Sequence, residues 1–134
     1  MKPPLLLDAS AIIALFRQEP GYQEVRRALA GRACSVCSVT LAEMEGKLVG
    51  RGDYTHSQVQ ASWGQLAPFV PELAFDADCR EKTAFYYARK NPYGLSLGAA
   101  ACFGTAEAHG LSVLTAERSW ASLPGLPFAV EPIR

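Results

Sequence analysis

Short apolar runs alternate with amphipathic segments along the whole chain. The run "PLLLD" at residues 4–8 is continuously apolar, which is typical of a strand buried on both faces of a parallel sheet. It precedes a predicted helix over residues 9–21, which Ser10 can cap and which Pro20-Gly21 ends. The same pattern predicts helices over residues 22–31, 40–52, 55–67, 76–90 and 96–109, and strands over residues 33–39, 69–75, 111–117 and 127–133. This alternation predicts a single α/β domain over residues 1–134, with a mainly parallel sheet and helices on both faces.

The composition narrows the class of protein. A chain of 134 residues that is 49% apolar can bury a core without disulfides or structural metal. No apolar run approaches the roughly 18 residues that span a membrane, and the N-terminal segment lacks the features of a signal peptide. We therefore expect a cytoplasmic protein with no membrane partner. The 13 basic and 13 acidic residues balance, which argues against a general electrostatic grip on nucleic acid.

The cysteines do not form a recognisable metal or redox motif. Cys34 and Cys37 have half the spacing of a zinc site, but Cys79 and Cys102 are isolated and so are both histidines. The Cys34-x-x-Cys37 pair also lies in a strand-like run rather than at the start of a helix. Small buried cysteines are the better interpretation.

Three acidic residues fall at equivalent ends of predicted strands. Asp8 ends the first strand, Glu43 lies in the first turn of the helix after the second strand, and Glu117 follows residues 112–115. The functional crevice of an open α/β sheet lies beyond the carboxyl ends of its strands, so the three carboxylates share one edge. Carboxylates without histidine or cysteine partners suit a hard cation such as Mg²⁺ or Mn²⁺.

Each acid also has a purely structural interpretation. Asp8 can help to cap the following helix, Glu43 can complete a capping box with Thr40, and Glu117 can be a solvated turn residue. Taken singly, these interpretations are preferred. Taken together at one edge of the sheet, the three acids favour a metal site.

A basic stripe continues from Glu43 along its helix. Lys47 and Arg51 follow at i+4 and i+8, so the three side chains share one face. Two cations beside a metal-binding acid can contact the phosphates of an RNA backbone. The alternative is a solvated face with one ion pair between Glu43 and Lys47.

Four segments in order and register resemble a known family. They are "LLLDASAIIALF", "VTLAEMEGKL", "YGLSLGAAACFGTA" and "LSVLTAERSWASL", and together they cover essentially the whole chain. The sequence resembles PIN-domain proteins, and most of all the VapC ribonuclease toxins of bacterial toxin–antitoxin modules. The resemblance implies a PIN-like α/β/α sandwich and an endoribonuclease that uses Mg²⁺ or Mn²⁺ to cleave structured RNA, either tRNA or rRNA. It also implies a homodimer that a VapB-type antitoxin silences, with operator DNA bound only through that antitoxin.

The resemblance also implies roles for particular residues. Asp8, Glu43 and Glu117 correspond to the family's acidic metal ligands, although many members have aspartate where this chain has Glu117. Ser10 and Thr115 correspond to the hydroxyl residues that support the carboxylates. Lys47 and Arg51 do not belong to the motifs, so their proposed phosphate contacts rest on spacing alone.

The largest departure from the family pattern is at Ala99. VapC-like proteins generally read G-L-S-L-G-D where this chain reads "GLSLGA", and the family's aspartate is a central metal ligand. If Ser96 caps the helix, position 99 is its third residue, where an acid meets the positive end of the helix dipole. We therefore expect this chain to be nearly or wholly inactive as a nuclease, with its fold intact because alanine favours helix.

Two explanations fit an alanine at this position. One is a substitution made to disable the enzyme, and the other is a naturally degenerate member of the family. We favour the first because Asp8, Glu43, Ser96 and Thr115 are all retained.

Other functional classes also fit part of the pattern. A degenerate PIN-like module would act only through its antitoxin and operator DNA. A receiver-type domain would need paired acids near the first strand and a late lysine, whereas no lysine follows Lys90. The resemblance also implies an apolar dimer face. Its candidates are Trp63, Phe85, Tyr86, Tyr87 and Phe103, which can equally belong to the core or to an antitoxin groove.

Overall fold

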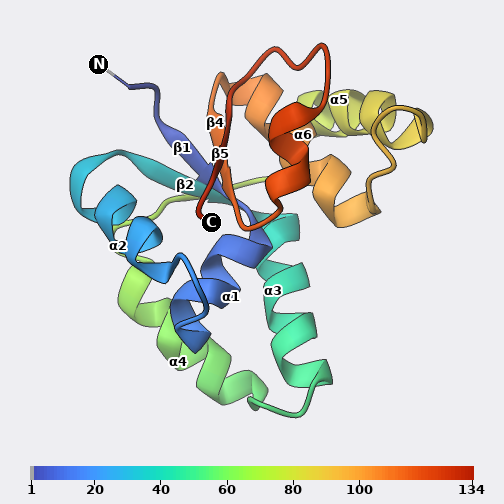
Figure 1. Ribbon diagram of the computed structural model, residues 1–134. Helices are drawn as coiled ribbons and strands as arrows, with labels where there is room; N and C mark the ends of the chain where they lie inside the picture. Colours follow the sequence, from blue (N-terminus) through green and yellow to red (C-terminus); the bar gives the residue numbers. More distant parts are fainter. Residues whose placement is uncertain (1) are drawn as a thin grey trace.

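The computed structural model describes residues 2–134, and its centre is a parallel β-sheet (Figure 1). The strands lie in the order β3-β2-β1-β4-β5, and every neighbouring pair is parallel. Their bounds are β1 (Leu5–Leu7), β2 (Cys34–Cys37), β3 (Glu72–Leu73), β4 (Ser112–Thr115) and β5 (Val130–Pro132). The predicted parallel sheet is confirmed.

Helices cover both faces of this sheet. In Figure 1 the first four helices gather below the sheet and α5 and α6 lie above it. Their bounds are α1 (Ala9–Arg17), α2 (Tyr22–Gly31), α3 (Ser38–Gly50), α4 (His56–Leu66), α5 (Ala77–Ala88) and α6 (Leu97–His109), with a short 3₁₀ helix η1 (Arg118–Ser122) before β5. The predicted α/β/α sandwich is therefore confirmed, whereas no sequence pattern predicted η1. None of the helices described between residues 2 and 134 is long and apolar enough to cross a membrane.

Strand β1 joins the two layers of core. Leu5 and Leu7 pack into the cluster formed with α1 to α4, whereas Leu6 packs with residues of α6 and β4 on the opposite face. All three side chains are fully buried. Successive side chains of a strand point to opposite faces, so a continuous apolar run is what a strand between two helical layers requires.

Helices α5 and α6 form a tightly packed pair. A Cβ at Gly104 would lie 2.3 Å from Thr83 Oγ1, so the helices approach at a distance that only glycine permits. Tyr86 and Phe103 fill the space beside this contact, with ring centroids 5.6 Å apart. The Tyr86 hydroxyl donates to Glu107 Oε1 at 2.6 Å. Burial and this hydrogen bond raise the pKa of Tyr86 well above its usual value.

Burial sorts the aromatic residues proposed as a dimer face. Tyr86 and Phe103 are 2% and 0% exposed, so of the alternatives left open for them they belong to the core. Phe85 and Tyr87 are 47% and 42% exposed. Trp63 of α4 is partly buried against the core. Among these five candidates, Phe85 and Tyr87 are the exposed ones.

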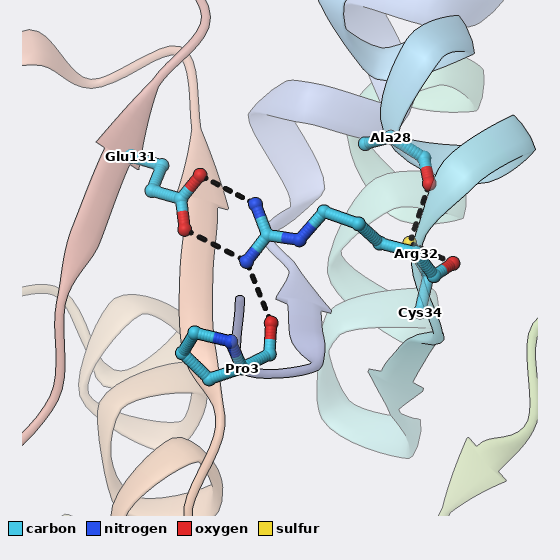
Figure 2. Close-up of polar contacts among 5 residues, drawn as sticks. All are labelled: Pro3, Ala28, Arg32, Cys34 and Glu131. Atoms are coloured by element: carbon cyan, nitrogen blue, oxygen red, sulfur yellow. Dashed lines mark hydrogen bonds and ion pairs between the residues drawn. The ribbon is translucent and has the colours of Figure 1, made fainter. Parts of the chain in front are cut away.

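Arg32 connects its own segment, between α2 and β2, to β5 and to the N-terminal segment (Figure 2). Its Nη1 and Nη2 donate to the two carboxylate oxygens of Glu131 at 2.6 and 3.0 Å, and Nη2 also donates to the Pro3 carbonyl at 2.6 Å. Cys34 Sγ lies on the other side, against the carbonyls of Ala28 and Arg32. The arginine therefore ties β5 and the N-terminal segment to the connection between α2 and β2.

The structure decides two predicted helix caps. The N-cap of α1 is Asp8 rather than Ser10, which confirms the capping interpretation of Asp8, and the Asp8 carboxylate accepts from the Ser10 amide at 3.2 Å. Helix α3 begins at Ser38, so Thr40 lies inside it and no capping box forms with Glu43. The buried Thr40 hydroxyl has no hydrogen-bond partner among residues 2–134.

Other expectations need smaller corrections. Helix α1 ends at Arg17 because Gln18 takes a left-handed conformation with φ 53°. The strand expected over residues 69–75 shrinks to the two residues of β3. All four cysteines are free and buried, which confirms the interpretation of them as core residues.

Candidate functional site

Asp8 lies where β1 passes into α1, and its backbone still belongs to the sheet. Its amide donates to the Leu114 carbonyl at 3.0 Å, which keeps Asp8 extended beyond the last residue of β1. The residue is 3% exposed. A carboxylate this deeply buried requires polar partners, because an unpaired charge away from water is costly.

The partners of the Asp8 carboxylate are the hydroxyl groups of Ser10 and Thr115 and the backbone amide of Ser10. Ser10 Oγ donates to Asp8 Oδ2 at 2.5 Å, and Thr115 Oγ1 donates to the same oxygen at 3.1 Å. Each hydroxyl in turn accepts a backbone amide at 2.9 Å, that of Ala116 for Ser10 and that of Glu117 for Thr115. This network fixes the carboxylate plane. All of these hydrogen bonds to the Asp8 carboxylate end on Oδ2, and no residue between 2 and 134 donates to Oδ1.

Glu43 reaches the same place from α3. Its side chain is 20% exposed, and Lys47 Nζ lies 3.5 Å from Oε2 at the i+4 position. The carboxylate rests against the first turn of α6, where a Cβ on Gly98 would lie 2.4 Å from Oε2. Glu43 therefore bridges α3 and α6.

The first turn of α6 closes the opposite wall. Ser96 is the N-cap, and its Oγ accepts from the Ala99 amide at 3.2 Å, so the predicted cap is confirmed. Ala99 is 6% exposed and presents only a methyl group. The helix thus directs its positive end toward the cavity with no acidic residue in its first turn.

These residues surround one cavity of about 220 Å³ at the carboxyl edge of the sheet. The predicted positions that line it are Asp8, Ser10, Glu43, Lys47, Ala99 and Glu117. Thr115 lies behind Asp8 and reaches the site only through its hydrogen bond, and Arg51 does not line the cavity.

Burial raises the pKa of the Cys102 thiol, and the nearby charge of Asp8 adds to that shift.

Sequence reasoning missed two residues of the site. Trp120 of η1 lines the cavity and packs edge-on against Phe103, with centroids 5.0 Å apart. No pattern predicted η1, so nothing indicated Trp120. Gly98 is the second such residue, and the signal that could have found it is a glycine in the first turn of a helix, where alanine is the better helix former.

The donor atoms in the cavity are of the type that Mg²⁺ and Mn²⁺ prefer, but the set of ligands is incomplete. The cavity offers carboxylate oxygens, including the free Oδ1 of Asp8, and hard cations prefer oxygen ligands. Within the described residues, however, no three His, Cys, Asp or Glu side chains form a group that could hold a metal ion. The acids are of the right kind, and Ala99 lines the same cavity with only a methyl group.

The fold and this cavity define the class of protein: a parallel α/β sandwich with a carboxylate site at the carboxyl edge of its sheet. The model of the PIN domain family matches residues 5–126. The chain therefore belongs to the PIN-domain family. No curated protein matches it.

Solved structures share the fold over nearly their whole length. A chain of the VapBC2 complex of Rickettsia felis, bound to a DNA fragment from its promoter, is 14% identical with a TM-score of 0.74, and the alignment covers 96% of this chain and 97% of that one. A chain of DNA-bound VapBC from Salmonella typhimurium is 19% identical with a TM-score of 0.72, covering 99% and 100%. Mycobacterium tuberculosis VapC20, described as a toxin that cleaves the sarcin–ricin loop, is 18% identical with a TM-score of 0.70, covering 89% and 95%.

Proposed function

We propose that residues 1–134 form a single domain that is the toxin of a VapBC-type toxin–antitoxin module. Its active form is a metal-dependent endoribonuclease that cleaves structured RNA, either tRNA or rRNA. The observation that carries the proposal is one cavity lined by Asp8, Glu43 and Glu117 beside position 99. Membership of the PIN-domain family and the likeness to VapBC complexes and to VapC20 support it.

The carboxylates have separate tasks in this proposal. Asp8 offers Oδ1 to the cation while Ser10 and Thr115 hold Oδ2, which fixes the ligand's orientation. Glu43 and Glu117 would hold the cation from the other walls of the cavity. The chemistry that Mg²⁺ or Mn²⁺ would supply there is a lowered pKa of the attacking water and neutralisation of charge on the scissile phosphate.

Two basic residues extend the site along α3. Lys47 lines the cavity and is half exposed, so its ammonium group can contact a phosphate next to the cleaved bond. Arg51 lies one turn further, at the C-terminal end of α3, where it would contact a more distant phosphate. Neutralising either should weaken RNA binding and reduce its salt dependence.

Ala99 leaves this chain nearly or wholly inactive. Losing a residue that supports a metal ligand commonly lowers affinity or activity about 10- to 100-fold, and losing a ligand costs more. The absence of a three-ligand group among residues 2–134 supports this part of the proposal. The retained network around Asp8 favours a disabling substitution over gradual decay of the site.

The decisive experiment restores the acid. Ala99→Asp should cleave total RNA in the presence of Mn²⁺ or Mg²⁺, and EDTA should abolish the cleavage. Ala99→Asn, which has the same shape without the charge, is the matched control and should remain inactive. If Ala99→Asp neither cleaves RNA nor arrests growth on expression, the nuclease proposal is wrong. Sequencing the RNA ends that it produces identifies the target.

The proposed partners follow from the same family. The toxin forms a homodimer in the cytoplasm, a VapB-type antitoxin sends a basic side chain toward the acidic cavity, and the complex binds operator DNA through the antitoxin. Co-expression with the antitoxin encoded beside it should give a complex that retards promoter DNA, whereas the toxin alone should not. Light scattering on the toxin measures the dimer directly.

A catalytically degenerate module is the second candidate function. The lack of a metal-holding group in the described residues favours it, since such a chain would act only through antitoxin and operator. Ala99→Asp separates the candidates. A degenerate module gains no RNA cleavage and still forms the DNA-binding complex.

A further inference from the structure

The carboxylate of Glu43 occupies the space that a side chain at position 98 would fill. A Cβ built on Gly98 would lie 2.4 Å from Oε2, 2.6 Å from Cδ and 2.8 Å from Oε1 of Glu43. Ordinary van der Waals contact with a Cβ begins near 3.4 Å. Even alanine at position 98 would therefore drive the nearest carboxylate oxygen back by about 1 Å.

The backbone gives no reason for glycine at this position. Gly98 is the second residue of α6, and it is not among the glycines with positive φ. Glycine is a poorer helix former than alanine, and the next three residues, 99–101, are all alanine. By contrast, a Cβ on Gly46 in α3 would meet nothing within 4 Å. The special feature of Gly98 is its contact with Glu43.

The Glu43 carboxylate is held from two sides. Gly98 lies beneath it, and Lys47 Nζ approaches Oε2 at 3.5 Å from the same helix as Glu43. Position 99 is the next residue along α6, so this contact sets how far the Glu43 oxygens lie from an acid at position 99. Cation ligands must be placed to within about half an ångström, which makes a shift of about 1 Å consequential.

We propose that Gly98 is a positioning residue, which lets the Glu43 carboxylate rest on the first turn of α6 beside position 99. The inference rests on the proposed function in taking Glu43 as a member of the metal site. A larger residue at position 98 leaves the fold intact, because the carboxylate is the far end of a flexible side chain and swings away. Its effect falls on the position of Glu43.

The first test measures the contact without metal or RNA. The thermal midpoint Tm is compared for the unsubstituted chain, Gly98→Ala, Glu43→Ala and the double variant, with Gly46→Ala as the matched helical control. With Glu43 removed, Gly98→Ala should raise Tm as much as Gly46→Ala does. With Glu43 present the rise should be smaller. Equal shifts in both backgrounds would overturn the proposal.

The second test measures the consequence for the site, with position 99 restored by Ala99→Asp. Gly98→Ala should weaken Mn²⁺ binding, measured by calorimetry, about 10- to 100-fold, whereas Gly46→Ala should leave it unchanged. In a Glu43→Gln background, Gly98→Ala should have no further effect. If Gly98→Ala binds Mn²⁺ as tightly as Gly46→Ala, Gly98 does not position the ligand. If Ala99→Asp itself binds no Mn²⁺, the proposed function fails, and the Tm comparison still decides the contact.

Discussion

Restoring the acid at position 99 should make the stability of the fold depend on metal. Ala99 is 6% exposed and shares its cavity with Asp8, Glu43 and Glu117, so a new carboxylate is placed among like charges with little water. Two carboxylates about 6 Å apart repel by roughly 3 kcal/mol at an effective dielectric constant of about 20. The positive end of the α6 dipole stabilises a carboxylate at position 99 and offsets about 0.3–1 kcal/mol of this repulsion. Without metal, Ala99→Asp should therefore lower the free energy of unfolding by about 2 kcal/mol.

A divalent cation bound by the restored site should reverse this effect. At a concentration about 100 times its dissociation constant, a ligand of the folded state stabilises by about 2.7 kcal/mol. For a chain of this length 1 kcal/mol corresponds to roughly 4 °C in Tm, so the loss in EDTA is about 8 °C and Mn²⁺ restores about 10 °C.

The assay is thermal unfolding of both proteins in EDTA, in Mn²⁺, and in KCl of matching ionic strength. KCl separates charge screening from specific binding. The unsubstituted chain should respond much less to Mn²⁺. A similar Tm change in both proteins would refute the idea that position 99 completes a metal site.

Three further predictions concern the scaffold. Folding raises the pKa of Tyr86, so the stabilisation from its neutral hydroxyl is complete below about pH 10 and is lost above that pH by about 1.4 kcal/mol per pH unit. Tyr86→Phe should remove this loss from the free energy of unfolding, measured in urea between about pH 9.5 and 11.5. The same pH dependence in both proteins would contradict the prediction. Glu131→Gln leaves the Arg32 guanidinium without its carboxylate partner and should lower the free energy of unfolding in urea by about 1–3 kcal/mol. The control Glu24→Gln breaks an exposed ion pair and should lower it by less than about 0.5 kcal/mol. Equal losses would show that the Arg32 contacts do not hold these segments together. Gly104→Ala places a Cβ within 2.9 Å of three atoms of α5 and should destabilise by about 1–3 kcal/mol, so a higher Tm in thermal unfolding would contradict the close packing.

The sheet could be predicted from sequence because burial leaves a simple signature. The leucine run of β1 must face two helical layers, and only a strand buried on both sides needs such a run. The sequence offers both Asp8 and Ser10 as the cap of α1, and a tertiary contact decides between them, because the ladder bond from the Asp8 amide keeps that residue extended. The start of α3 at Ser38 was not predicted. The Ser38 hydroxyl contacts Glu72 and the Leu73 carbonyl of the neighbouring strand β3.

The candidate site was predictable to the same extent. Strand ends place acids at one edge by topology alone, and Asp8, Glu43 and Glu117 line one cavity as that reasoning expects. The contact between Glu43 and Gly98 was not predictable, since it joins the tip of one side chain to the backbone of another helix. Trp120 enters the cavity from a 3₁₀ helix that has no periodic signal.

The two outer strands also limit how the protein can associate. Strand β3 has two residues and β5 has three, the last of which is Pro132, which lacks an amide hydrogen. Very short edge strands and a proline at an edge disfavour the addition of another strand. Extension of this sheet by a second copy or by another protein is therefore disfavoured. Recognition through side chains on the helices and loops would let substitutions on those surfaces change its partners while the strand framework stays the same.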